Sequence, residues 1–128
     1  MNSKIKRVLV TGATGQIGYN ICLAILESEK ELIVLGRKNE ENFRQEFSLP
    51  CKYFQWSNPA KCLPPVQAMD VDAVIHLMGE PLDGNRWTEQ KKLEIRSSRI
   101  NSTKNMVNAI KNSQERIKVF VTASAIGI

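Results

Sequence analysis

One stretch, VLVTGATGQIG at residues 8–18, limits the fold of this chain more than any other. It begins with a short apolar run and continues into a segment whose apolar residues recur at helical spacing. Between the two stand Gly12, Gly15 and Gly18, spaced three residues apart. A buried strand, a glycine-rich turn and an amphipathic helix in this order are typical of a sheet that carries helices on both faces.

Strand and helix signals keep alternating along the rest of the chain. The gaps between strands are too long for hairpins, so we expect right-handed crossovers between parallel strands. The prediction is a single-domain α/β fold over residues 1–128, a doubly wound parallel sheet (Rossmann) of about five strands in the order 3-2-1-4-5, truncated after strand five. Strands are expected at 5–10, 31–36, 51–56, 71–79 and 117–123, and helices at about 17–29, 43–47, 66–69 (one turn) and 88–112.

Two of these helices carry apolar stripes that we expect to face the sheet. Thr88 is the expected N-cap of the long helix. The stripe of the first helix is Ile17, Ile21, Ala24 and Ile25, and that of the long helix is Leu93, Ile100, Thr103, Val107 and Ile110.

The glycine turn has the features of a phosphate-binding site. The first glycine allows a tight turn, the second lets the backbone approach a pyrophosphate, and the third lets the helix pack on the strand. The helix N-terminus then offers free N–H groups and partial positive charge. We favour this reading over a glycine-rich turn without a ligand. The predicted dinucleotide-binding residues are Gly12, Ala13, Thr14, Gly15, Gln16, Ile17 and Gly18.

The end of the second predicted strand indicates which dinucleotide the site prefers. An NAD site carries Asp or Glu about 20 residues after the glycines, where it binds the ribose hydroxyls. Here the strand ends in LGRKN, so Arg37 and Lys38 follow Gly36 and no acid is present. A guanidinium can donate two hydrogen bonds to a 2′-phosphate, and NADP is therefore favoured over NAD. The alternative is that Arg37 is a solvated strand-end residue.

Composition narrows the function classes. The chain has 128 residues, of which 42% are hydrophobic. Cys22, Cys51 and Cys62 form no CxxC pair and are odd in number, so neither a disulfide framework nor a metal site is predicted, and a reducing cytoplasm is expected. No apolar run approaches the roughly 18 residues of a membrane span. The net charge of +5 is scattered, which is typical of a lysine-rich surface, and no nucleic-acid partner is expected.

Three segments together resemble a known family. TGATGQIG, DAVIHLMGEPLDGNRWTEQKKLEIRSSRI and KVFVTASAIG are similar to the extended, epimerase-like short-chain dehydrogenase/reductases, and more narrowly to the N-terminal half of their sugar-nucleotide epimerase-like subgroup. The resemblance implies that Leu77, Met78 and Gly79 lie beside the nicotinamide-side ribose. His76 stands where the family has asparagine, and we interpret it as a hydrogen-bonded strand residue. Arg99 is either an anion contact or a helix-surface charge.

The same resemblance implies that Ser124 is the catalytic serine, which holds an oxygen of the substrate. Its partners in the family are a Tyr-x-x-x-Lys pair, in which tyrosine is the acid/base. The tyrosines here are Tyr19 and Tyr53, and neither has lysine four residues on. We therefore expect the NADP-binding half of an oxidoreductase, inactive alone, whose full-length form acts on a sugar nucleotide. The alternative is a nucleotide-sensing or protein-interaction module without chemistry.

A homodimer is also expected. The fifth strand, Lys118 to Ala123, would form an open sheet edge, and such an edge is a template for another chain. The long helix is the second candidate interface. The alternative is a monomer whose last strand frays.

Overall fold

The computed structural model describes residues 5–77, 89–113 and 116–122. Five parallel strands form one sheet in the order β3-β2-β1-β4-β5, which confirms the predicted topology. The strands are β1 (Arg7–Thr11), β2 (Glu31–Gly36), β3 (Lys52–Gln55), β4 (Ala73–His76) and β5 (Val119–Thr122). The helices are α1 (Gln16–Glu27), α2 (Glu40–Glu46), the 3-10 turn η1 (Val66–Met69) and α3 (Glu89–Lys111).

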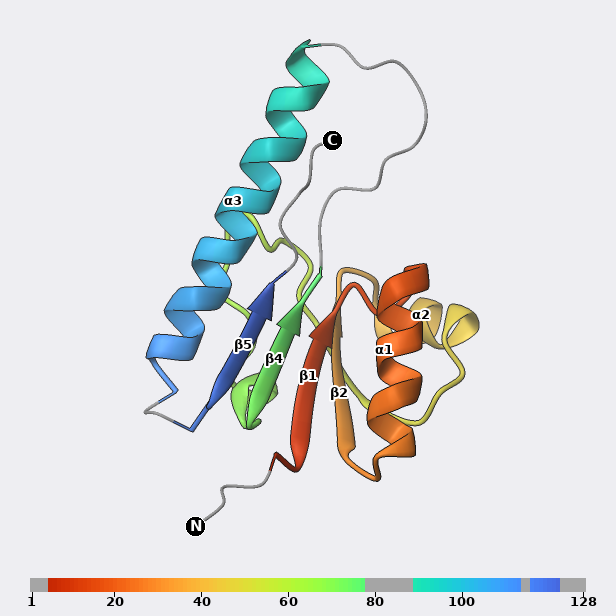
Figure 1. Ribbon diagram of the computed structural model, residues 1–128. Helices are drawn as coiled ribbons and strands as arrows, with labels where there is room; N and C mark the ends of the chain where they lie inside the picture. Colours follow the sequence, from red (N-terminus) through yellow and green to blue (C-terminus); the bar gives the residue numbers. More distant parts are fainter. Residues whose placement is uncertain (1–4, 78–88, 114–115, 123–128) are drawn as a thin grey trace.

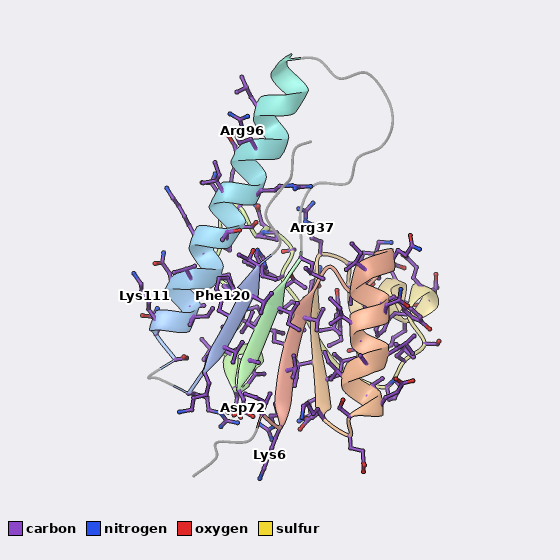
Figure 2. All side chains as sticks on the ribbon, viewed as in Figure 1. Lys6, Arg37, Asp72, Arg96, Lys111 and Phe120 are labelled. Atoms are coloured by element: carbon purple, nitrogen blue, oxygen red, sulfur yellow. The ribbon has the colours of Figure 1, made fainter. Side chains whose placement is uncertain are left out.

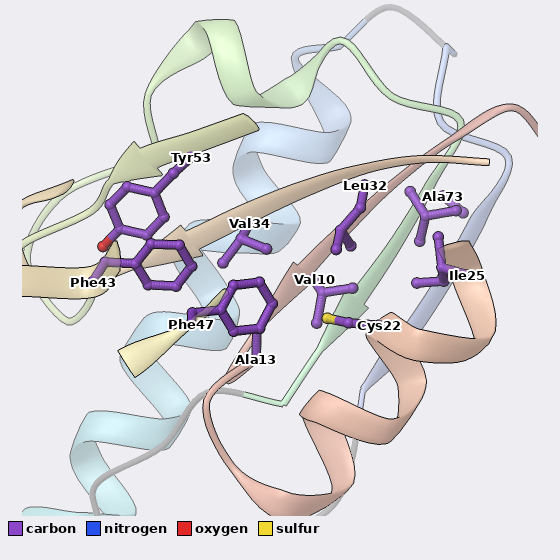
Figure 3. Packing of buried hydrophobic residues seen from close by; sticks show 11 residues of the cluster. Val10, Ala13, Cys22, Ile25, Leu32, Val34, Phe43, Phe47, Tyr53 and Ala73 are labelled. Atoms are coloured by element: carbon purple, nitrogen blue, oxygen red, sulfur yellow. The ribbon is translucent and has the colours of Figure 1, made fainter. Parts of the chain in front are cut away.

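Helices cover both faces of the sheet, because its central strands are apolar on both sides. Along β1, Val8 and Val10 pack into one cluster with α1 and α2, whereas Leu9 packs into another with α3 and η1. Figure 1 shows α1 and α2 beside β1 and β2, and α3 on the other side of the sheet. Figure 3 shows the first cluster, in which Phe43, Phe47 and Tyr53 meet the strands. Within the described ranges, no helix is both long and apolar enough to cross a bilayer.

The predicted helix faces are offset by about one residue, although Ile25 is buried as expected. In α1, Ile17 is 71% exposed, and the buried residues are Gly18, Cys22 and Ile25. The reason is that Gly18 lies directly against Gly12, so the face that includes Gly18 must turn to the sheet.

The long helix shows the same offset. Among the α3 side chains that the structure describes, Ser102, Met106 and Ala109 are buried, while Leu93 is 59% exposed and Ile100 is 48% exposed. Small residues on either side of Met106 let the helix approach the second cluster, and Asn105 Nδ2 donates to the carbonyl of Pro59 at 2.8 Å. The larger aliphatic residues are left on the flanks of this contact. Thr88, the expected N-cap, lies outside the described residues.

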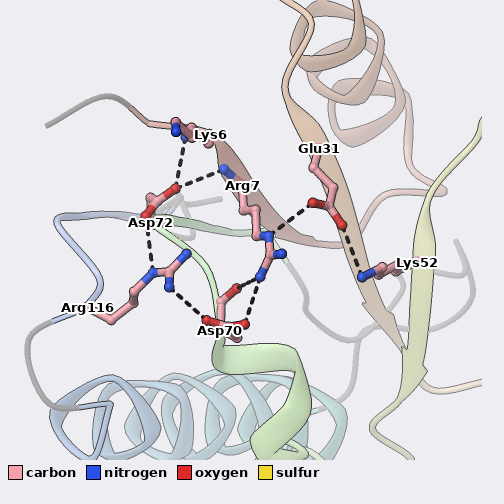
Figure 4. A network of polar contacts seen from close by, with 7 residues as sticks. All are labelled: Lys6, Arg7, Glu31, Lys52, Asp70, Asp72 and Arg116. Atoms are coloured by element: carbon pink, nitrogen blue, oxygen red, sulfur yellow. Dashed lines mark hydrogen bonds and ion pairs between the residues drawn. The ribbon is translucent and has the colours of Figure 1, made fainter.

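The amino-terminal edge of the sheet is closed by a network of charged groups (Figure 4). The Asp72 carboxylate accepts the backbone N–H groups of Lys6 and Arg7 at 2.9 and 3.0 Å. Burial alone would raise the pKa of Asp72, but these two bonds and the Arg116 guanidinium lower it. Further ion pairs join Arg7 to Glu31 and Asp70, Arg116 to Asp70 and Asp72, and Lys52 to Glu31. The glycine turn lies at the opposite, carboxyl edge.

Candidate dinucleotide site

The glycine turn joins β1 to α1, and two of its glycines are required by geometry. Gly12 has a φ of +75°, in the left-handed region, and a Cβ there would lie 3.0 Å from the carbonyl carbon of Leu77. A Cβ on Gly18 would lie 2.0 Å from the Gly12 carbonyl oxygen. The first and third glycines therefore hold the turn, the neighbouring strand β4 and the helix in close contact, as the sequence predicts.

The second glycine has a different role. Gly15 is the N-cap residue of α1, with no side-chain cap and no acid in the first turn of the helix. The nearest atom to a Cβ on Gly15 would be the Gly12 oxygen, at an ordinary 3.6 Å, so the position is open. An uncapped helix N-terminus behind a small residue presents N–H groups and positive potential to an anion. The turn therefore fits the pyrophosphate of a dinucleotide.

A pocket of about 380 Å³ opens beside this turn, at the carboxyl edge of the sheet. It brings together two regions that the sequence predicts separately, the glycine turn and the end of β2. None of the described residues that line it is acidic. They are Gly12, Ala13, Thr14, Gly15, Val34, Leu35, Gly36, Arg37, Lys38, Phe43, Tyr53 and Leu77.

The basic pair after β2 is held at the mouth of this pocket. Arg37 lies at the carboxyl edge of the sheet (Figure 2). Gln55 Nε2 donates to its backbone carbonyl at 3.0 Å. The Lys38 ammonium forms an ion pair with Glu46 of α2, and the Lys38 carbonyl accepts the Tyr53 hydroxyl at 2.5 Å. The backbone of both basic residues is therefore tied to β3.

The two aromatic residues of the pocket are not among the predicted site residues. Phe43 comes from α2 and Tyr53 from β3, and their rings stack with centroids 3.9 Å apart and an interplanar angle of 13°. Phe43 was expected only as part of a short helix. No local signal marks either ring as a pocket wall, because the pair forms only when α2 and β3 pack together.

The chain's only histidine lies at the end of β4, beside the turn. His76 is 2% exposed, and burial lowers its pKa to about 4. Its Nδ1 lies 2.9 Å from Thr11 Oγ1, which also accepts the N–H of Leu77 at 2.9 Å. Its Nε2 is buried without a hydrogen-bond partner among the described residues. The expected hydrogen bond of the ring is thus present at one nitrogen.

The other predicted residues are placed as follows. Gln16, Ile17 and Gly18 begin α1 and do not line the pocket, although Gly18 supports the turn from behind. Met78, Gly79 and Ser124 lie outside the described residues. Arg99 lies on α3, and its Nε is buried without a partner in the described part of the chain. No group of three or more His, Cys, Asp or Glu side chains among the described residues could hold a metal ion.

Comparison with known proteins decides the family. The sequence pattern of the NAD dependent epimerase/dehydratase family matches residues 8–128. The chain belongs to this family. An epimerase family protein from Staphylococcus saprophyticus subsp. saprophyticus is 32% identical over 123 residues, which are 96% of this chain and 39% of that protein. The chain thus spans about two fifths of the length of the curated relatives it matches.

Solved structures show the same fold. The nucleoside-diphosphate sugar epimerase from Corynebacterium glutamicum matches with a TM-score of 0.69 and 26% identity, over 95% of this chain and 23% of that one. The yeast methylglyoxal/isovaleraldehyde reductase Gre2, complexed with NADPH, matches with a TM-score of 0.64 and 18% identity, over 91% of this chain and 36% of that one. The chain therefore has the dinucleotide-binding fold of the epimerase/dehydratase family.

Proposed function

We propose that this chain is the NADP(H)-binding half of a sugar-nucleotide epimerase-like oxidoreductase. One observation carries the proposal: the pocket joins the glycine turn to Arg37 with no acidic residue among its described lining. A carboxylate at this place would repel a 2′-phosphate, whereas a guanidinium binds it through two N–H donors. The family and the fold support binding of a nicotinamide dinucleotide, and Arg37 supports the phosphorylated form.

Each part of the site has a role in binding. The backbone of Gly12 to Gly15 and the N-terminus of α1 hold the pyrophosphate, and Arg37 holds the 2′-phosphate. The Phe43 and Tyr53 rings form an apolar wall at the adenosine end. Leu77, Met78 and Gly79 flank the nicotinamide-side ribose. The dinucleotide, when bound, supplies hydride transfer, and the chain's own residues orient it.

The proposed reaction needs more residues than these. Ser124 would donate a hydrogen bond to an oxygen of the substrate, which we propose is a sugar nucleotide in the longer relatives. The Tyr-x-x-x-Lys pair that would exchange the proton is not among the 128 residues. We therefore propose that these residues bind the dinucleotide without turnover. A reducing cytoplasm suits the free thiols of Cys22, Cys51 and Cys62.

We also propose that two copies of the chain associate. Among the described residues, β5 is an edge strand, with Val119 42% exposed and Val121 48% exposed. Leu93 and Ile100 extend the apolar surface along α3. An edge strand with exposed apolar side chains favours pairing with another chain.

Calorimetric titration with NADPH and NADH tests the cofactor assignment. The wild-type chain should bind NADPH about tenfold more tightly than NADH, or better. The reason is that a charge-assisted hydrogen-bonded pair between a guanidinium and a phosphate contributes roughly 1.5–3 kcal/mol. Arg37→Glu should reverse the preference. Lys61→Glu, an exposed charge reversal away from the pocket, is the matched control and should leave it unchanged. Equal affinity of the wild-type chain for the two dinucleotides would contradict the proposal.

A further inference from the structure

Position 36 lies about 20 residues after the glycine turn, where an NAD site places its acidic residue. The structure leaves no room for a side chain there. A Cβ on Gly36 would lie 2.7 Å from Tyr53 Oη and 3.1 Å from Tyr53 Cε1. Gly36 does not have a positive φ, so its backbone would accept any residue. The three atoms nearest to this Cβ all belong to Tyr53.

Tyr53 cannot easily move aside. It is paired in register with Val34, so its ring projects from the same face of the sheet as Gly36. Its ring stacks on Phe43, its hydroxyl donates to the Lys38 carbonyl, and only 8% of it is exposed. Burial, ahead of the nearby Glu40, raises the pKa of Tyr53 to about 12, so the hydroxyl remains a neutral donor at physiological pH.

Two side chains of β3 also hold the backbone of the two basic residues. Tyr53 binds the carbonyl of Lys38, and its neighbour on β3, Gln55, binds the carbonyl of Arg37. The first residue after Gly36 that can present a side chain to the pocket is therefore Arg37, on a backbone that β3 holds fixed.

We propose that Tyr53 is a specificity-determining residue. Its ring restricts position 36 to glycine and so blocks an acid-bearing, NAD-selective site, while its hydroxyl holds the Lys38 carbonyl in place. This inference rests on the proposed NADP(H) function and adds the residue that enforces it. Exchange of Gly36 for aspartate should therefore fail to switch the cofactor unless Tyr53 is replaced as well.

A binding experiment tests the switch. NADPH and NADH are titrated into the wild-type chain, Gly36→Asp, Tyr53→Leu and the double variant Gly36→Asp/Tyr53→Leu. Gly36→Asp alone should weaken NADPH binding and gain no NADH binding, whereas the double variant should bind NADH more tightly than NADPH. A preference for NADH in Gly36→Asp, with Tyr53 in place, overturns the proposal, as does a double variant that still prefers NADPH.

A stability experiment without any dinucleotide keeps the test independent of the proposed function. Gly36→Ala should lower the urea midpoint in the wild-type background and lower it much less in the Tyr53→Leu background. The control is Gly15→Ala, whose Cβ has room, and it should shift the midpoint equally in both backgrounds. An equal loss for Gly36→Ala in the two backgrounds overturns the steric part of the proposal. If the wild-type chain binds neither dinucleotide, the proposed function fails, and the urea measurement still decides whether Tyr53 excludes a side chain at position 36.

Discussion

Thr11 and His76 are partnered across β1 and β4, and their side chains meet at 2.9 Å directly beneath the glycine turn. Both side chains are almost fully buried. Since Thr11 Oγ1 also accepts the Leu77 N–H, one hydroxyl ties the ends of the two strands together just before each enters the site. The backbone at Gly12 and Leu77, which we propose binds the dinucleotide, is thus anchored by a buried polar pair.

This pair predicts a pH dependence of stability. The pKa of His76 is about 4 in the folded chain and about 6.5 unfolded, so the unfolded chain binds more protons between these values. The free energy of unfolding should therefore fall as pH drops from about 6.5 to about 4, with a loss on the order of 3 kcal/mol. Urea denaturation at stepped pH measures this loss.

The control for that experiment is His76→Phe, which fills the site without titrating. Carboxylates such as Asp72 make the free energy of unfolding depend on pH in both proteins. The dependence should be steeper in the wild-type chain between about pH 4 and 6.5, because only the wild-type chain has His76. Parallel slopes would show that His76 does not have a depressed pKa.

The glycines of the turn should differ sharply in their tolerance of a methyl group. Gly18→Ala forces a Cβ to 2.0 Å from the Gly12 oxygen, and both groups are backbone-bound, so we expect a loss of about 3 kcal/mol or more. Gly15→Ala should cost about 1 kcal/mol or less in stability, because its Cβ has room. It should weaken NADPH binding, because a methyl group there would crowd the backbone N–H groups that we propose hold the pyrophosphate. Denaturation and titration of both variants measure the difference, and equal stability of the two would contradict this assignment.

These glycine roles show what the sequence could predict. The spacing of Gly12, Gly15 and Gly18 is sufficient to predict the turn, although Gly12 also faces Leu77 across the sheet. The sheet order follows from the alternation of elements. The predicted face of α1 is wrong at Ile17, which is apolar, because Gly18 is the residue in contact. Only the tertiary contact decides between neighbouring positions. The Tyr53–Gly36 contact joins β3 to β2, and no spacing within either strand reveals it.

The edge strand predicts association in solution. Light scattering over a dilution series should give a dimer mass at tens of micromolar. Val121→Lys should shift the chain toward monomer, because it places a charge on the exposed face of β5. Val66→Lys is the matched control, since Val66 on η1 is 83% exposed and belongs to neither β5 nor α3. A strictly monomeric wild-type mass would exclude the dimer.

The 128 residues should bind the dinucleotide without catalysing a reaction. We expect no NADPH oxidation and no sugar-nucleotide epimerisation, because a positioned general acid/base contributes on the order of 10² to 10⁴ in rate and the tyrosine–lysine pair is not in this sequence. Steady-state absorbance of NADPH with and without candidate sugar nucleotides measures this. Turnover that disappears in Ser124→Ala would show the reasoning to be wrong.

The central claim is that Arg37 recognises a 2′-phosphate in the pocket beside the glycine turn. The most direct measurement is titration with adenosine 2′,5′-bisphosphate and with 5′-AMP, which differ only in that phosphate. The bisphosphate should bind about tenfold more tightly or better, and Arg37→Glu should abolish this advantage while Lys61→Glu keeps it. Equal affinity of the wild-type chain for the two fragments, or an advantage that survives Arg37→Glu, would contradict it.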